Sequence, residues 1–244
     1  MNALPQIELS LTPALYDFRT IKEHHVTVAV DVLRATTAIC AAFQAGVHEI
    51  VPLDSLEALE PFRAQGYLRA AERDGYKIGD AECGNSPTEY LTMDLRGKRM
   101  AYSTTNGTVC ILRGSDADET LPGCFANISA LTQHLLSANK DVVILCSGWK
   151  NDFSIEDALF AGALSQRLLD SQRFATSNDA VLMAVNLWNL AKDNPYEYCK
   201  RNASHVHRLS GFGDGACRDI VFAFKPDTCP VVPHLANGRL TLAE

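Results

Sequence analysis

Residues 26–46 read VTVAVDVLRATTAICAAFQAG, and this stretch predicts a strand followed directly by a helix. Residues 26–32 are rich in β-branched and apolar side chains, which is typical of a buried strand. Residues 36–46 predict a helix, with Thr36 or Thr37 as its N-cap and Gly46 as its stop. A buried strand joined to a helix is the repeating unit of α/β proteins.

The same alternation continues along the rest of the chain. Further strands are expected at 48–53, 67–75, 98–103 and 141–148, and helices at 54–66, 154–170 and 178–193. In the 54–66 helix, Asp54 and Glu57 have capping-box spacing and Pro61 is expected to break or kink it. The pattern predicts one α/β domain over residues 1–244, layered α/β/α with a largely parallel or mixed sheet.

The composition of the chain restricts the kinds of partner that we expect it to bind. The 22 basic and 29 acidic residues give a formal charge of −7, without the basic face that nucleic-acid binding needs. No apolar stretch approaches the roughly 20 residues of a membrane span. The start, MNALPQIELS, has no basic segment followed by an apolar run, so we expect a cytoplasmic protein. Its eight cysteines include no CxxC pair and are expected to be reduced thiols.

Polar side chains collect where strands are expected to give way to helices, and ligands of open α/β sheets bind at such places. The first group is Asp31, Arg34, Thr36 and Thr37, a carboxylate, a guanidinium and two hydroxyls within seven residues. Taken alone, the group also fits a hydrogen-bonded strand end, a surface arginine and a helix cap.

The second group joins Glu72 and Lys77 to Asn85 and Ser86, followed by Pro87. Charges beside glycine are usually solvated turns, and Asn-Ser-Pro commonly places proline at the first position of a helix. This group therefore indicates either two ordinary turns or part of an anion site.

The third group is the turn Thr104-Thr105-Asn106-Gly107-Thr108, between a strand and a short helix. Backbone N–H groups point outward at a helix N-terminus, and the helix dipole favours negative charge there. Thr and Asn are also good helix caps. The turn alone predicts either a cap or a cradle for an anion.

The fourth group is Ser154, Glu156 and Asp157. Ser154 and Asp157 fit a capping box, which leaves the adjacent Glu156 unexplained. Hard cations such as Mg²⁺ prefer carboxylate and phosphate oxygens. Together the four groups predict phosphoryl chemistry and a Mg²⁺ ion bound among Asp31, Glu72, Glu156 and Asp157.

A haloacid-dehalogenase-like phosphatase is the alternative enzyme. Residues 116–120, DADET, spell the DxDxT motif, and Asp214 and Asp219 resemble its late acidic motif. The motif should follow directly on a buried strand, whereas residues 113–115 intervene here and predict an acidic surface loop. A non-catalytic anion-binding protein is the alternative of another class, because it would need the 104–108 turn and Arg34 without four carboxylates.

Several segments follow one another in an order that resembles the 2-phosphosulfolactate phosphatase family: DVLRATTA (31–38), AERDGYKI (71–78), GNSP (84–87), TTNGT (104–108), NISAL (127–131), SGW (147–149), FSIEDALFAG (153–162), the segment from His205 to Arg208-Leu209, and VVP (231–233). The resemblance spans roughly residues 26 to 233. It implies an α/β fold and a Mg²⁺-dependent phosphatase that converts 2-phosphosulfolactate and water to 3-sulfolactate and phosphate, a reaction related to coenzyme M biosynthesis.

On this hypothesis the substrate is a small phosphorylated anion, and Asp31 and Glu156 are the catalytic residues. Arg34 and the turn would hold the phosphoryl oxygens, and the expected substrate-binding set is Arg34, Thr36, Thr37, Lys77, Asn85, Ser86, Thr104, Thr105, Asn106 and Gly107. Either water attacks phosphorus, or Asp31 attacks and forms an aspartyl-phosphate. Water is favoured because Asp31 lacks the second aspartate of dehalogenase-type nucleophiles.

Histidines and subunit contacts are less sharply predicted. His205 or His207 could protonate the leaving alkoxide, although a polar position in a loop is the simpler interpretation. Whether the protein forms a homo-oligomer stays open, because the apolar helix at 178–188 fits either the core or a subunit interface.

Overall fold

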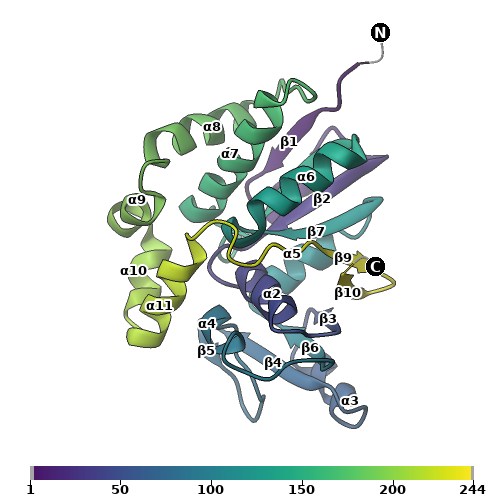
Figure 1. The fold of residues 1–244 in the computed structure, drawn as a ribbon, viewed down its shortest axis with the longest axis vertical. Coiled ribbons are helices and arrows are strands. Elements are labelled where there is room, and N and C mark those ends of the chain that lie inside the picture. Colours follow the sequence, from purple (N-terminus) through teal and green to yellow (C-terminus); the bar gives the residue numbers. More distant parts are fainter. Residues whose placement is uncertain (1–2, 243–244) are drawn as a thin grey trace.

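The expected strand at 26–32 forms as β2 (His25–Val30), and all six of its residues are buried. In the computed structural model, which describes residues 3–242, β2 lies inside a four-stranded parallel sheet (Figure 1). The order of that sheet is β1 (Ile7–Ser10), β8 (Asp141–Cys146), β2 and β7 (Glu119–Gly123).

A second sheet has six strands and is mixed. Its order is β5 (Tyr76–Lys77), β4 (Leu68–Arg73), β6 (Arg99–Ser103), β3 (Glu49–Leu53), β10 (Arg239–Leu242) and β9 (Pro233–Ala236). Strands β4, β6 and β3 run parallel, while β5, β10 and β9 pair in the antiparallel sense. The α/β class is confirmed, but the strands divide between two sheets. That residues 1–244 form one domain stays a prediction.

The helices follow or flank the strands. They are α1 (Pro13–Tyr16), α2 (Ala35–Gln44), α3 (Glu60–Arg63), α4 (Pro87–Tyr90), α5 (Gly107–Arg113), α6 (Ile128–Ala138), α7 (Ile155–Asp170), α8 (Asp179–Ala191), α9 (Pro195–Asn202), α10 (Ser204–Ser210) and α11 (Asp214–Ala223), with 3₁₀ turns at Glu57–Leu59 and Phe125–Asn127. Within the described residues, no helix has the length and apolarity that crossing a bilayer requires.

Both faces of the parallel sheet are covered, which explains the nearly continuous apolar sequence of β2. Val28 and Val30 pack in a core with side chains of α6 and α7. Ala29, between them, faces a second core that contains α2 and residues of the second sheet, including Met100 and Tyr102. Successive side chains of a strand point to opposite faces, so one strand serves two cores.

The prediction of a helix over residues 54–66 is mostly wrong. Only the 3₁₀ turn and the four-residue α3 are helical, and Pro61 lies in the first turn of α3. Asp54 does not cap a helix; the Ser55 hydroxyl accepts from the Ala58 N–H instead. Proline lacks an N–H and fits a helix only at its first positions, so Pro61 divides the segment into two short pieces.

Two further local predictions are corrected. Helix α2 starts at Ala35, and its N-cap is Arg34 rather than Thr36 or Thr37. The acidic loop expected around residues 116–120 runs into strand β7, which begins at Glu119. Strand β1 was not expected from the sequence either.

Candidate active site

Residues that follow the carboxyl ends of strands in both sheets line one narrow cavity, which we call the inner cavity. Its walls include Asp31, Arg34, Glu72, Asn85, Thr105, Asn106, His205 and Arg208. Asp31 follows β2, Glu72 lies near the end of β4, and Asn106 follows β6. The inner cavity holds about 20 Å³, room for about one water molecule or a small ion.

A larger cavity adjoins the inner one and shares Trp149, His205 and Arg208 with it. This outer cavity measures about 310 Å³, and Glu156 lines it. That volume lies at the lower end of the range of small-molecule sites. The two cavities together could take a compact anion, with a narrow end at Asp31 and a wider end beside Trp149.

Asp31 is a carboxylate held in an unfavourable setting. Burial, with a smaller contribution from the neighbouring Glu72 and Glu156 carboxylates, raises its pKa to about 6. His205 and the Ala35 backbone N–H act in the opposite direction. A buried acid whose pKa is raised by desolvation and like charge is a group that a cation would stabilise.

Glu156 lies in the first turn of α7 and is only 1% exposed. Its Oε1 accepts a hydrogen bond from Nδ1 of His205 at 2.7 Å. Its Oε2 is buried and has no hydrogen-bond partner among the described residues. An unpartnered buried carboxylate oxygen is costly, so Glu156 offers a free ligand atom next to the cavities.

Glu72 is tied to the turn that was predicted to cradle an anion. Its Oε1 accepts from the Thr105 hydroxyl at 3.1 Å and from the Gly75 N–H at 2.5 Å, and its Oε2 accepts from the Thr105 N–H at 3.1 Å. These bonds fix the turn after β6 against the end of β4. The carboxylate keeps lone pairs for a cation, because each oxygen can accept more than one bond.

Asp157 does not line either cavity, although it was predicted beside Glu156 as a metal ligand. Its Oδ1 accepts from the Val32 N–H at 2.9 Å. Its Oδ2 accepts from the Gly148 N–H at 3.2 Å and from the Ser147 hydroxyl at 3.3 Å. Asp157 thus joins the segments that follow β2 and β8 and holds them in register. Burial raises the pKa of Asp157, and Glu156 and Asp31 add to the effect.

Arg34 lines the inner cavity but is also paired. One terminal nitrogen donates to Oδ2 of Asp219 at 2.8 Å, and the other donates to the Gly75 carbonyl at 2.9 Å. The second oxygen of Asp219 accepts from the Ser86 hydroxyl at 2.8 Å and from the Thr88 hydroxyl at 2.5 Å. Asp219 therefore positions the guanidinium and ties α11 to the start of α4.

Several predicted substrate-binding residues lie elsewhere. Thr36 and Thr37 are fully buried, and their hydroxyls donate to the Asp31 and Val32 carbonyls. Thr104 and Thr108 bond to each other at the start of α5. Lys77 is exposed on β5 and is not among the residues that line the two cavities.

Gly107 and Ser86 have packing and capping roles. A Cβ on Gly107 would come within 2.3 Å of the Ala35 Cβ and 2.6 Å of Oδ2 of Asp31. Only glycine fits this close approach of α5 to α2 and Asp31. Ser86 caps α4 by accepting from the Glu89 N–H, as the proline after it suggested.

The dehalogenase-type aspartates lie apart from the cavity residues. Asp116 accepts from Tyr16 at 2.9 Å and from Arg19 at 2.5 Å, and Asp118 accepts from Lys140 at 2.8 Å. Both precede β7, whereas the cavity lies beyond the carboxyl ends of strands. Their ion pairs give them a structural explanation.

His205 and Arg208 are the side chains that sequence reasoning weighted too little. Both lie on α10, which is helical rather than the loop suggested for His205. Their spacing of three residues places them on one face of the helix. That spacing and the family resemblance of the segment from His205 to Leu209 were the available signals. The Arg208 guanidinium lies 4.4 Å from the centre of the Trp149 ring, and burial lowers the pKa of Arg208.

Comparison with known proteins identifies the family. A family model described as 2-phosphosulpholactate phosphatase matches residues 11–238. The chain belongs to this family. A "Probable 2-phosphosulfolactate phosphatase" of Caldanaerobacter subterraneus subsp. tengcongensis is 34% identical over 224 residues, which cover 90% of this chain and 91% of the relative. One from Prochlorococcus marinus is 37% identical over 199 residues, 79% of this chain and 82% of the relative.

A third relative with the same name, from Thermotoga maritima, is 33% identical over 222 residues, 91% of this chain and 94% of the relative. The match to the 2-phosphosulpholactate phosphatase family includes every residue described above for the two cavities, from Asp31 to Arg208. The matched range also includes Asp219, which was named above only for the dehalogenase-like alternative.

Proposed function

We propose that this protein is a Mg²⁺-dependent phosphatase that hydrolyses 2-phosphosulfolactate, or a closely related phosphorylated hydroxy acid, to the hydroxy acid and phosphate. Family membership and the names of the relatives support this reaction. The observation that carries it is the meeting of Asp31, Glu72, Arg34 and His205 at one narrow cavity. A cytoplasmic location and self-association stay predictions from the sequence.

The carboxylates suit Mg²⁺. Asp31 and Glu156 would hold the ion. Burial and like charge raise the pKa of Asp31, and Oε2 of Glu156 is buried without a hydrogen-bond partner among the described residues. Glu72 would contribute from the β4 side. Asp157 stays in the candidate set, although both of its oxygens already accept hydrogen bonds. When bound, Mg²⁺ would offset the negative charge of the phosphoryl group in the transition state.

The cationic side chains suit the substrate. Arg34 and Arg208 both line the inner cavity, and Arg208 also lines the outer one. We assign Arg34 to the phosphoryl group, because Asp219 holds it rigidly at the narrow end. Arg208 is assigned to the carboxylate or sulfonate at the wider end. Asn106 would donate from its amide to a phosphoryl oxygen, since its carbonyl oxygen already accepts from the Lys150 N–H.

His205 is proposed as the general acid. A carboxylate without a proton can only accept a hydrogen bond, so the bond to Oε1 of Glu156 places a proton on Nδ1 of His205. Nε2 is then the nitrogen that gains and donates a proton. From the wall shared by both cavities, it would protonate the alkoxide that leaves phosphorus.

The nucleophile is either water or Asp31. We favour water, because Asp31 lacks the neighbouring second aspartate of dehalogenase-type enzymes. A single turnover in ¹⁸O-water, followed by mass spectrometry of the peptide that contains Asp31, separates the two. Label in phosphate alone supports direct attack by water, whereas label in the Asp31 carboxylate would establish an aspartyl-phosphate.

The function is tested by phosphate release from a panel of phosphorylated acids: 2-phosphosulfolactate, phospholactate, 2-phosphoglycerate and phosphoserine, each with Mg²⁺ and with EDTA. We expect release that depends on Mg²⁺ and is fastest with 2-phosphosulfolactate. No release from any of the four with Mg²⁺ present would refute the proposed function.

A further inference from the structure

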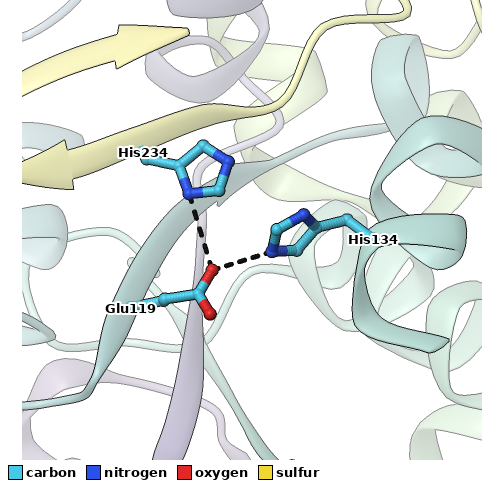
Figure 2. A group of neighbouring side chains, drawn as sticks. All are labelled: Glu119, His134 and His234. Carbon is cyan, nitrogen blue, oxygen red and sulfur yellow. Dashed lines mark hydrogen bonds and ion pairs between the residues drawn. The ribbon is translucent and has the colours of Figure 1, made fainter. Parts of the chain in front are cut away.

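Two histidines and a glutamate converge at the end of the parallel sheet opposite the cavities. Glu119 is the first residue of β7, His134 lies on α6, and His234 lies on β9. Figure 2 shows the three side chains pointing toward one another from these three elements. One ligand atom from each residue lies within 4.8 Å of the other two. Nothing in the proposed phosphatase chemistry uses this cluster.

The two imidazoles share one oxygen. Nε2 of His134 lies 2.8 Å from Oε2 of Glu119, and Nδ1 of His234 lies 3.5 Å from the same atom. A tetrahedral Zn²⁺ with bonds of about 2.0–2.1 Å separates its ligand atoms by about 3.4 Å. The three atoms are therefore near the required spacing, and small side-chain rotations would bring them onto one ion.

The surroundings of the cluster suit a metal ion that is intermediate between hard and soft. The three side chains are each between 22% and 27% exposed, so an ion could enter from solvent and still be partly desolvated. Within residues 3–242, no lysine or arginine forms an ion pair with Glu119; its only ion-pair partners there are these two histidines.

We propose that Glu119, His134 and His234 form a binding site for a divalent transition metal such as Zn²⁺. Imidazole nitrogens with one carboxylate are typical ligands of Zn²⁺ and of similar ions, whereas Mg²⁺ prefers oxygen. Three protein ligands leave one position for water. The metal would link β9, near the end of the chain, to β7 and α6, so its role would be to fasten the β9–β10 hairpin to the parallel sheet.

The test measures Zn²⁺ binding to the whole protein in excess Mg²⁺, which competes for the carboxylate-rich cavities but poorly for imidazole. Equilibrium dialysis compares wild type with His234→Ala, His134→Ala and a control, His48→Ala, whose histidine is exposed and does not belong to the cluster. We expect wild type and the control to bind one Zn²⁺ more per chain than the two site variants. Equal binding by all four proteins, or no binding by wild type, would overturn the proposal.

Thermal unfolding gives a second reading of the same site. Zn²⁺ at about 100 times its dissociation constant should raise the midpoint of wild type and of the control by about 5–10 °C. The site variants should show no such rise. His234→Ala should keep its Mg²⁺-dependent phosphate release, which shows that it is folded. A rise in His234→Ala as large as in wild type would contradict the assignment.

Co²⁺ provides a spectroscopic control. Bound by two imidazoles, a carboxylate and water, it should give visible absorption bands in wild type that are lost in His134→Ala. Bands that persist in both site variants would place the metal elsewhere and overturn the proposal.

Discussion

The guanidinium of Arg34 donates to the carboxylate of Asp219 at 2.8 Å, although 185 positions separate the two residues. Both side chains are nearly inaccessible, at 7% and 1% exposure. The pair joins the turn after β2 to α11, and it sets the direction of a cation that faces the inner cavity. The proposed phosphate site therefore depends on a residue that does not itself line that cavity.

Asp219→Asn should destabilise the protein and weaken substrate binding together. Breaking a buried ion pair leaves an uncompensated charge and costs about 3–5 kcal/mol, so we expect a loss of about 3 kcal/mol in the free energy of unfolding by urea. Among molecules still folded, KM should rise. Asp214→Asn, an exposed change at the start of the same helix, is the matched control and should behave as wild type. Equal stability of the two variants would contradict this role of Asp219.

Glu156→Gln should reduce Mg²⁺-dependent turnover by about 10²–10³-fold, the scale seen when one preorganised electrostatic group is removed. The amide has the shape of the carboxylate but loses the charge that attracts Mg²⁺ and orients His205. Steady-state phosphate release at increasing Mg²⁺ measures the effect, with Asp170→Asn at the far end of α7 as control. A protein that merely binds anions would keep its phosphate affinity in Glu156→Gln and would show no turnover in any form.

Asp31→Asn should stabilise the metal-free protein at neutral pH while abolishing turnover. The folded pKa of Asp31 is raised to about 6 from an ordinary 3.8. Between these values the folded protein binds more protons than the unfolded chain, so its stability falls as pH rises through that window. Above pH 6 the buried charge of Asp31 therefore lowers the free energy of unfolding by about 3 kcal/mol. The asparagine variant carries no charge at this position and does not lose this stability.

Urea unfolding in EDTA at pH 4 and at pH 7.5 checks this expectation. Wild type and Asp31→Asn should be similar at pH 4, and the variant should be more stable at pH 7.5. A variant that is less stable than wild type at pH 7.5 would show that the Asp31 carboxylate is favourable in the metal-free fold.

His205→Gln should slow the release of poor leaving groups more than good ones. General acids typically contribute about 10²–10⁴-fold, and the alkoxide of a hydroxy acid needs a proton as it leaves. Turnover of 2-phosphosulfolactate should fall by that order, while p-nitrophenyl phosphate, whose leaving group needs no proton, should be much less affected. His207→Gln, two residues along α10, is the control. Equal losses on both substrates would remove His205 from the acid role.

Strand positions followed from the sequence because apolar periodicity reports burial directly. The strands at β2, β3, β4, β6 and β8 were expected close to where they form. The division of the strands into two sheets was not expected, because the pairing of strands depends on contacts that the local sequence does not encode. Strand β7 was missed because its first residue, Glu119, belongs to an acidic stretch of sequence. The Glu119 carboxylate is paired with His134 and His234, which lie far from it in the sequence.

Site residues were predictable where a side chain has no local structural use. Asp31 and Glu156 stood out and do lie at the cavities. Thr36 and Thr37 looked equally functional, but their hydroxyls serve backbone carbonyls five residues earlier. Asp219 could not be found from its neighbours in sequence, because its partners are Arg34, Ser86 and Thr88.

Anomalous scattering from crystals grown with Mn²⁺ and phosphate tests the central claim most directly. Mn²⁺ replaces Mg²⁺ at oxygen sites and can be located without ambiguity. The account predicts a Mn²⁺ peak bonded to carboxylate oxygens of Asp31 and Glu156, with phosphate between that ion and Arg34. A cavity without Mn²⁺ at saturating concentration, or phosphate bound away from Arg34, would contradict it.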